Sequence, residues 1–530
     1  MRAFFKKYGH LIVILAGILL TVGFFIILYS DFASIGTDGV AYALLGQSIA
    51  QGHGLTIYGV AHTVFSPLLP VVIALIFLVS HSLEFATVGS SFIAGLISIP
   101  LFYLLCRKIA SSTVALIGLI FFVFDSNFIF SYLGPSPQIL VMLLSIILFL
   151  ILLGFIKPPS KNIYFWIFRA LGVGVLCGLM YLARPEYFFF IIPVIIALLL
   201  IMPRAVRMRW RIFAAIICLL GFIIVSTPYL FFLHRHTGGW TFTGRSSAIG
   251  LFVTGQLDEN VQGDNFLEPS TSQSVDSGGV IGSLFRHPAT AAKKLFKGLR
   301  DAQRNFSQVL GLLIIGLVAL GIRDFILKRK FKELLIIVIF LTPLIAVAIG
   351  QGGTANYLVQ FYFIFLILAA VGSVSLLEDI NRILNLSKTL RIVLGIVLIG
   401  GTAASLFITV PQNILFTPPD SLRKEFKQMG VWIRENHPEA KDQPMLTRKP
   451  ATAFYAGAQF VDLPLKKSIR ELIDFMRSKK IKYLTIDQRY VLTESPQLAD
   501  LIDPSKTPRD LELIHSIDYL GHGIYFYRLR

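Results

Sequence analysis

An aspartate near the start of this basic chain is the first residue that points to chemistry. Asp38 lies in the segment GTDGVAY, residues 36–42. A carboxylate that accepts a proton from an incoming hydroxyl acts as a general base. The alternative is structural, because apolar residues follow at helical spacing up to Ala50 and an aspartate often caps the start of a helix. Both roles can hold, since a cap would fix the position of the carboxylate.

Six further residues are candidates for substrate binding: Tyr42, His62, Arg184, Glu186, Arg235 and Arg245. A histidine can bind phosphate or relay a proton near neutral pH, and an arginine can hold a phosphate through two parallel hydrogen bonds. Each has a plainer interpretation. A loop histidine can be an ordinary surface group, Arg184-Pro185-Glu186 can be a tight turn with an internal ion pair, and basic residues at a membrane interface can bind lipid phosphates.

Long apolar segments must position these residues. The chain has 530 residues, of which 55% are hydrophobic and only 15% charged. An apolar helix of about 20 residues spans the hydrocarbon core of a bilayer and satisfies its own backbone there. The sequence therefore predicts an all-α polytopic membrane protein with about 11 transmembrane helices. We expect them near residues 11–30, 87–105, 113–130, 138–156, 163–183, 187–202, 212–232, 308–322, 333–349, 358–377 and 391–409.

The distribution of basic residues predicts which loops face the cytoplasm. Lys and Arg collect in cytoplasmic loops, and this chain has 48 of them with a net charge of +18, yet none between Asp31 and Ala86. We therefore expect a cytoplasmic N-terminus, a first outer loop at 31–86 that carries Asp38, and an extracytoplasmic C-terminus. The basic excess follows the membrane spans, so we expect no nucleic-acid partner. Pro67–Ser80 is too short to cross and should form a re-entrant or interfacial helix.

Two more outer regions are expected. A loop at 233–307 should end in a basic helix on the membrane surface, between His287 and Arg304. After a transmembrane domain at 1–410, residues 411–530 alternate helix-like and strand-like pieces and predict a small extracytoplasmic α/β domain. The helix-like pieces are 421–436 and 468–478, and the strand-like pieces are 444–447, 482–487, 511–517 and 523–529.

Motifs of soluble enzymes are missing from the sequence. It has no phosphate-binding P-loop, no dinucleotide-binding GxGxxG after a strand, no HExxH, no GxSxG and no CxxC. Its three cysteines fall inside apolar runs, which favours buried thiols over disulfides or metal ligands. A cytoplasmic site for a soluble nucleotide sugar is therefore not indicated.

Taken in order along the chain, these features resemble the GT-C fold glycosyltransferases. The most similar group holds the protein O-mannosyltransferases, the bacterial aminoarabinose transferases and the galacturonosyltransferase-like bacterial enzymes. The resemblance covers most of the chain and rests on the following features: Asp38 with Tyr42, the segment SPLLP at 66–70, the basic pair Arg107-Lys108, the turn Arg184-Pro185-Glu186, and an outer-face tail.

The resemblance implies an inverting transfer of a sugar from a polyprenyl-phosphate carrier to a hydroxyl acceptor, which would be a lipid, a glycan or a protein. The reaction would take place on the outer face of a bacterial inner membrane, with Asp38 as the catalytic base. The lipid-linked sugar would be a co-substrate, and no further cofactor is expected. The chain departs from many relatives at two places. Ser136 or Gln138 stands near the expected second acid, and Gly39 follows Asp38 where relatives have two adjacent acids. A divalent metal is thus possible but not indicated.

Three other functions remain open from the sequence. An oligosaccharide polymerase or ligase also uses lipid-linked sugars, and it would rely on the late outer loop with Arg235 and Arg245. A transporter would need polar residues inside its spans, which are nearly free of them apart from Asp125 and Arg184. A non-catalytic lipid-binding or scaffold protein would fit if Asp38 only caps a helix.

Overall fold

The long helices lie close to the positions predicted from the sequence. The computed structural model describes residues 2–31, 35–156, 163–203, 206–244, 282, 286–351, 355–408, 423–464 and 466–530. Helices occupy all eleven predicted segments. They are α1 (Arg2–Asp31), α4 (Leu83–Ile109), α5 (Ser112–Phe124) with α6 (Ser126–Tyr132), α7 (Pro137–Ile156), α8 (Ile163–Ala183), η1 (Pro185–Phe190) with α9 (Ile191–Ile201), α10 (Met208–Thr237), α13 (Pro288–Leu327), α14 (Phe331–Phe340) with α15 (Pro343–Gln351), α16 (Ala355–Leu384) and α17 (Lys388–Ile408).

Nine of these helices in the described part of the chain are long and apolar enough to cross a membrane, or ten if one bent pair is a single span. Their outer faces carry large apolar side chains, such as Leu19, Ile224 and Ile396, each about two-thirds exposed. Contiguous apolar surface of this kind is costly in water and suits contact with lipid. The chain is therefore a multi-span membrane protein.

Two predicted spans differ from simple crossing helices. The third is broken between α5 and α6, which meet at 58°. Asp125 lies at the break and its carboxylate accepts a hydrogen bond of 2.9 Å from the Asn127 amide, so it caps the new helix. The sixth begins as a 3-10 turn at Pro185 and forms a shorter apolar helix up to Ile201. Proline at the first helical position favours such a start.

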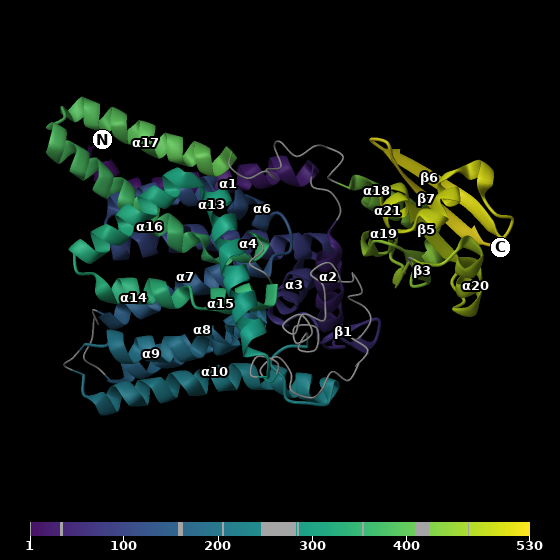
Figure 1. Ribbon diagram of the computed structural model, residues 1–530, viewed down its shortest axis with the longest axis horizontal. Coiled ribbons are helices and arrows are strands. Elements are labelled where there is room, and N and C mark those ends of the chain that lie inside the picture. Colours follow the sequence, from purple (N-terminus) through teal and green to yellow (C-terminus); the bar gives the residue numbers. More distant parts are fainter. Residues whose placement is uncertain are drawn as a thin grey trace.

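The segment predicted as the first outer loop forms compact structure at one end of the helix bundle. It contains α2 (Thr37–Ala50), a hairpin of β1 (Thr56–Ile57) and β2 (Val60–Ala61), and α3 (Leu68–Ser80). The short apolar helix predicted here is α3, at 13 residues. A Cβ added to Gly46 would lie 2.5 Å from Ile73 Cγ2, so the glycine lets α2 and α3 approach closely. Figure 1 shows α2 and α3 on the side of the bundle that faces the C-terminal sheet.

The basic segment at the end of the predicted second outer loop is helical, as predicted, and is continuous with the next span. Both belong to α13, which is interrupted at Gly311, where φ is 71°. Only glycine adopts this backbone conformation without strain. Most of the second outer loop, residues 245–281, lies outside the described residues.

The C-terminal residues form a mixed five-stranded sheet with helices, in agreement with the predicted α/β pattern. The strand order is β4 (Gln459–Asp462), β3 (Pro444–Thr447), β5 (Tyr483–Asp487), β7 (His522–Leu529) and β6 (Leu511–Tyr519). Strand β3 runs parallel to β4 and β5, whereas β7 pairs antiparallel with β5 and β6. The helices are α18 (Lys424–Asn436), α19 (Pro450–Ala456), α20 (Ile469–Ser478) and α21 (Gln488–Glu494). The domain boundary predicted near residue 410 lies outside the described residues.

The C-terminal unit docks on the first outer loop through polar contacts. Glu84, at the start of α4, accepts hydrogen bonds from Lys427 Nζ at 2.5 Å and from the Tyr455 hydroxyl at 2.9 Å. The Tyr455 oxygen also accepts the backbone amide of Ile35 at 3.1 Å. The Tyr58 hydroxyl accepts the backbone amide of Phe460 at 3.1 Å. These contacts join residues more than 300 positions apart and fix the sheet above the loop that carries Asp38.

Candidate active site

Asp38 lies in the first turn of α2 and its side chain is exposed. The residue at the N-cap is Gly36, which makes no side-chain capping bond. Asp38 is therefore not the N-cap residue of α2, so the structural alternative is not observed. A carboxylate in the first turn still interacts favourably with the positive end of the helix dipole, which favours its ionised form.

The residue after Asp38 has a steric reason to be glycine. A Cβ at Gly39 would lie 2.4 Å from Ile35 Cγ2 and 2.8 Å from Pro135 Cγ. Neither distance is tolerated without movement of α2 or of the segment before α7. A second acid directly after Asp38 is thus incompatible with this packing.

Asp38 opens into a small cavity together with several of the predicted residues. The cavity has a volume of about 150 Å³. It brings together Asp38 and Tyr42 from α2 with Arg184 and Glu186 from the turn between α8 and η1. The other lining residues are Val64, Phe65, Ser66, Pro135, Pro137, Gln138, Ala183, Pro185, Thr243 and Tyr357. Segments from six parts of the chain therefore converge on one carboxylate.

Arg184 is held firmly in the wall of this cavity. Its side chain is buried, with 6% of the residue exposed. Its Nε donates to Glu186 Oε1, and its guanidinium lies over the Tyr357 ring at 4.5 Å from the ring centre. A guanidinium has five N–H donors, so one bond to Glu186 is compatible with a further contact to an anion. The arrangement orients a permanent positive charge beside the space that Asp38 faces.

Tyr42 and His62 are linked through an aromatic neighbour. The rings of Tyr42 and Phe65 lie 4.7 Å apart, and His62 stacks on Phe65 at 5.4 Å with an angle of 13°. Tyr42 and Phe65 line the cavity, whereas buried His62 lies behind Phe65 and is not a lining residue. The ring of Phe65 therefore separates His62 from the cavity, so His62 does not have the substrate-contacting position expected from the sequence.

The two arginines of the second outer loop are not brought into the cavity by the described residues. Arg235 is exposed in the last turn of α10 and is not among the lining residues. Arg245 lies outside the described residues. Thr243, two positions earlier, does line the cavity, and the backbone at Gly244 approaches Thr63 so closely that a Cβ would lie 2.1 Å from its carbonyl oxygen.

Tyr357, Gln138 and Phe65 line the cavity but are not among the predicted site residues. Tyr357 follows the ninth predicted span, and no local pattern in the sequence predicts its contact with Arg184. Gln138 stands where many relatives have a second acid, and its Oε1 accepts a hydrogen bond of 2.9 Å from Ser136. Phe65 is an apolar residue, and its neighbours in the sequence did not indicate that it lines the site.

The described residues do not form a metal site. No group of three or more His, Cys, Asp and Glu side chains is arranged to hold an ion anywhere in the described ranges. The carboxylates that line the cavity are Asp38 and Glu186, and Glu186 is already bound to Arg184. Divalent ions bind through several oxygen ligands, a set that these residues do not supply together.

Comparisons with known proteins show which folds this chain resembles. Residues 62–231 match the family model described as dolichyl-phosphate-mannose-protein mannosyltransferase. The archaeal oligosaccharyltransferase AglB from Archaeoglobus fulgidus, solved with an inhibitory peptide and a dolichol-phosphate, is similar with a TM-score of 0.61 and 14% identity, over 95% of this chain and 74% of that one. ArnT from Cupriavidus metallidurans, bound to undecaprenyl phosphate, is similar with a TM-score of 0.55 and 10% identity, over 98% of both chains.

No curated protein matches the chain. The solved structures are similar over almost the whole chain, although their sequences have diverged far. These likenesses confirm the fold expected from the sequence, including the helical membrane part and the small C-terminal sheet.

Proposed function

Because this chain has the GT-C fold of membrane glycosyltransferases, we propose that it is an inverting glycosyltransferase that uses a polyprenyl-phosphate sugar. The acceptor is a hydroxyl group of a lipid, a glycan or a protein on the outer face of the membrane. One observation carries the proposal: Asp38 and the buried cation Arg184 line the same cavity, at the end of the bundle that faces the C-terminal sheet.

The residues divide the work of transfer between them. Asp38 accepts the proton of the acceptor hydroxyl. The acceptor oxygen attacks the anomeric carbon from the side opposite the phosphate, so that the new C–O bond forms as the bond to the phosphate oxygen breaks. The polyprenyl phosphate leaves with the electron pair, and the configuration at the sugar inverts. Arg184 lies where it stabilises the departing phosphate, with its orientation fixed by Glu186 and Tyr357.

The nature of the donor is supported by the similar structures. The archaeal oligosaccharyltransferase was solved with a dolichol-phosphate, and ArnT was solved with undecaprenyl phosphate. Both ligands are polyprenyl phosphates, the leaving group that this mechanism requires. The departure of such a phosphate is stabilised by a cation and does not require a general acid. Arg184 is the cation that lines the cavity. We place the enzyme in the bacterial inner membrane, with the N-terminus in the cytoplasm and Asp38 and the C-terminal unit outside.

Replacement of Asp38 by asparagine tests the proposal. The Asp38→Asn protein should fold normally but transfer sugar roughly 100- to 10,000-fold more slowly, since it lacks the base. The assay follows radiolabelled sugar from polyprenyl phosphate into the acceptors of washed native membranes. Asp474→Asn, at an exposed position of α20, is the matched control and should retain the parent rate. A folded Asp38→Asn protein with the parent rate would refute the assignment.

The alternative of an oligosaccharide polymerase or ligase makes the opposite prediction. It relies on Arg235 and Arg245 in the late loop, and it does not need Asp38. Comparison of Asp38→Asn with the double variant Arg235→Ala/Arg245→Ala in the same assay distinguishes the two. Loss of transfer in the arginine variant together with full activity of Asp38→Asn would favour the alternative.

A further inference from the structure

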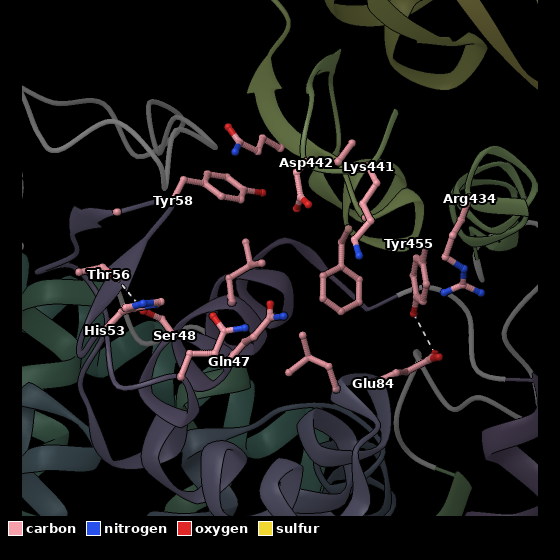
Figure 2. Close-up of a pocket in the computed structure, with 18 of the residues that line it drawn as sticks. Gln47, Ser48, His53, Thr56, Tyr58, Glu84, Arg434, Lys441, Asp442 and Tyr455 are labelled. Carbon is pink, nitrogen blue, oxygen red and sulfur yellow. Dashed lines mark hydrogen bonds between the residues drawn. The ribbon is translucent and has the colours of Figure 1, made fainter. Parts of the chain in front are cut away.

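A second, larger cavity lies between the first outer loop and the C-terminal unit, away from Asp38. Its volume is about 940 Å³. One wall comes from the C-terminal half of α2, the β1–β2 hairpin and the start of α4. The other wall comes from α18, α19 and the residues before β3 and β4. Figure 2 shows side chains from both walls facing this space, among them Gln47, Tyr58 and Asp442. We call it the interface cleft.

The Asp38 cavity is too small for a whole acceptor. At about 150 Å³ it is comparable to an engineered protein cavity that holds one benzene molecule, whereas sites for organic ligands typically enclose roughly 300–1,000 Å³. It can hold the reacting groups, but the rest of a large acceptor must bind elsewhere. The interface cleft has the size for this, and the two cavities share none of their described lining residues.

The charges in the interface cleft favour a neutral ligand. Its lining includes two acids, Glu84 and Asp442, and two strong bases, Arg434 and Lys441. Glu84 is bound to Lys427 and Tyr455, so the strong charges left to a ligand are Asp442 against Arg434 and Lys441. An excess of one positive charge is small for a phosphate-rich ligand. A ligand with many uncharged hydrogen-bonding groups suits this surface best.

Uncharged polar side chains line both walls of the cleft. The side-chain amides of Gln47 and Gln459 line it from opposite walls, and neither makes a hydrogen bond to another described residue. Each amide offers two donors and an acceptor with two lone pairs. Neighbouring hydroxyls of a sugar ring present both donors and acceptors, and they match such amides.

An aromatic ring at the cleft is positioned at a conformational cost. Tyr58 is at the tip of the β1–β2 hairpin with φ of 51°, followed by Gly59 with φ of 80°. Bulky residues rarely adopt this left-handed conformation, which turns of this kind usually reserve for Asn, Asp or Gly. The Tyr58 hydroxyl is fixed by the Phe460 amide, yet 39% of the residue remains exposed. A fixed ring with an open face suits the apolar C–H face of a sugar.

We propose that the interface cleft binds the saccharide part of the acceptor, at a distance from the reacting hydroxyl. This inference rests on the proposed function, and it narrows the acceptor from any hydroxyl compound to a glycan of several sugar units. Helix α2 links the two places, with Asp38 near its start and Gln47 about 14 Å further along at 1.5 Å per residue. A glycan chain held at the cleft would present a terminal unit toward Asp38.

Binding of free oligosaccharides tests the inference. The full-length protein in detergent is probed by saturation-transfer NMR with a panel of neutral tri- to hexasaccharides built from hexoses and N-acetylhexosamines. We expect at least one to bind to the parent protein, and the double variant Gln47→Ala/Gln459→Ala to bind it at least 10-fold more weakly. Gln428→Ala, exposed on α18 outside the cleft, is the matched control and should bind as the parent does.

Two further arms separate the possible failures. Tyr58→Phe keeps the ring and should retain binding, whereas Tyr58→Ala should lose it. Asp38→Asn should still bind the oligosaccharide. If it binds but also transfers sugar at the parent rate, the assignment of Asp38 as the base fails and the cleft assignment stands. The inference is overturned if no oligosaccharide binds at millimolar concentration, if the glutamine double variant binds normally, or if only short peptides or phosphatidylglycerol vesicles compete for the cleft.

Discussion

At the scale of single residues, Arg184 is the group that gives the proposed mechanism its preference for a phosphate. Asp38 by itself could deprotonate many hydroxyls, but a base does not select a leaving group. In the proposed mechanism the guanidinium of Arg184 makes this selection, because its burial strengthens its attraction for a developing phosphate charge. The ion pair with Glu186 holds this charge in place without neutralising the donors that point elsewhere.

Substitution of Arg184 should reduce turnover strongly. We expect Arg184→Gln to lower kcat roughly 100- to 1000-fold, as removal of a transition-state donor does elsewhere. Arg184→Lys should recover part of the rate, since it keeps the charge but loses the planar fork. The measurement is the initial rate of sugar transfer at saturating polyprenyl-phosphate sugar.

A stability control is needed, because Arg184→Gln leaves the partly buried Glu186 carboxylate without its partner. The double variant Arg184→Gln/Glu186→Gln removes both charges and should melt close to the parent protein. It should remain as slow as the single variant. Recovery of activity in the double variant would show that Arg184 serves folding and not transfer.

At the scale of elements, the close contact between α2 and the segment before α7 sets the position of Asp38. Gly39→Ala should shift α2 away from Pro135, because a Cβ there has no room. Overpacking of this kind costs about 1–3 kcal/mol. We expect a lower melting temperature together with a loss of transfer activity at temperatures where the variant is still folded.

Gly172→Ala in α8 is the control, since a Cβ at that position meets nothing within 4 Å. It should retain both stability and activity. Normal activity of a folded Gly39→Ala protein would mean that the exact placement of α2 is unimportant for transfer.

Asp487 makes the C-terminal sheet sensitive to pH. Burial raises the pKa of Asp487 to about 6, although hydrogen bonding from the Tyr490 amide and the charge of Lys449 oppose the shift, while Glu425 and Glu494 add to it. The folded protein therefore binds a proton that the unfolded chain releases near pH 4. Stability should fall as the pH rises from about 4 to 6 and stay lower above it.

Asp487→Asn tests this pH dependence. The amide oxygen can still accept the Tyr490 N–H and cap α21, but it does not titrate. At pH 7 the variant should be more stable than the parent by roughly 1–3 kcal/mol, and the difference should vanish near pH 4. Thermal unfolding of both proteins in detergent, followed by tryptophan fluorescence across this range, measures it. A constant difference at all pH values would contradict the assignment.

The elements were predictable from the sequence where one local signal decided them. The apolar segments predicted the long helices. The strand at 444–447 was predicted with its exact bounds, because a short apolar run between turn residues can be recognised from the neighbouring sequence alone. The break at Asp125 was not predicted, since it depends on a polar cap inside an apolar run. The contact of Tyr357 with Arg184 joins residues 173 positions apart, and no local pattern reports such a pair.

At the scale of the whole molecule, Glu84 connects the membrane part to the C-terminal unit. It binds Lys427 from α18 and Tyr455 from α19, and both contacts are partly buried. Glu84→Ala should weaken docking and raise amide hydrogen exchange in α18 and α19 about 3- to 10-fold, which corresponds to roughly 1 kcal/mol. Helix α20 makes no part of this contact and should exchange at the parent rate. Equal acceleration in α20 would indicate unfolding of the whole unit.

The stiffness of α2 has a consequence for product pattern. A helix of 14 residues keeps a constant length, so the span from the proposed base near its start to the amide of Gln47 cannot adapt to different acceptors. Such a rod would act as a molecular ruler. The enzyme would then add its sugar at a fixed number of units from the part of the glycan bound in the interface cleft. The length of α2 would thus set a regular spacing of the added sugars along an envelope polysaccharide.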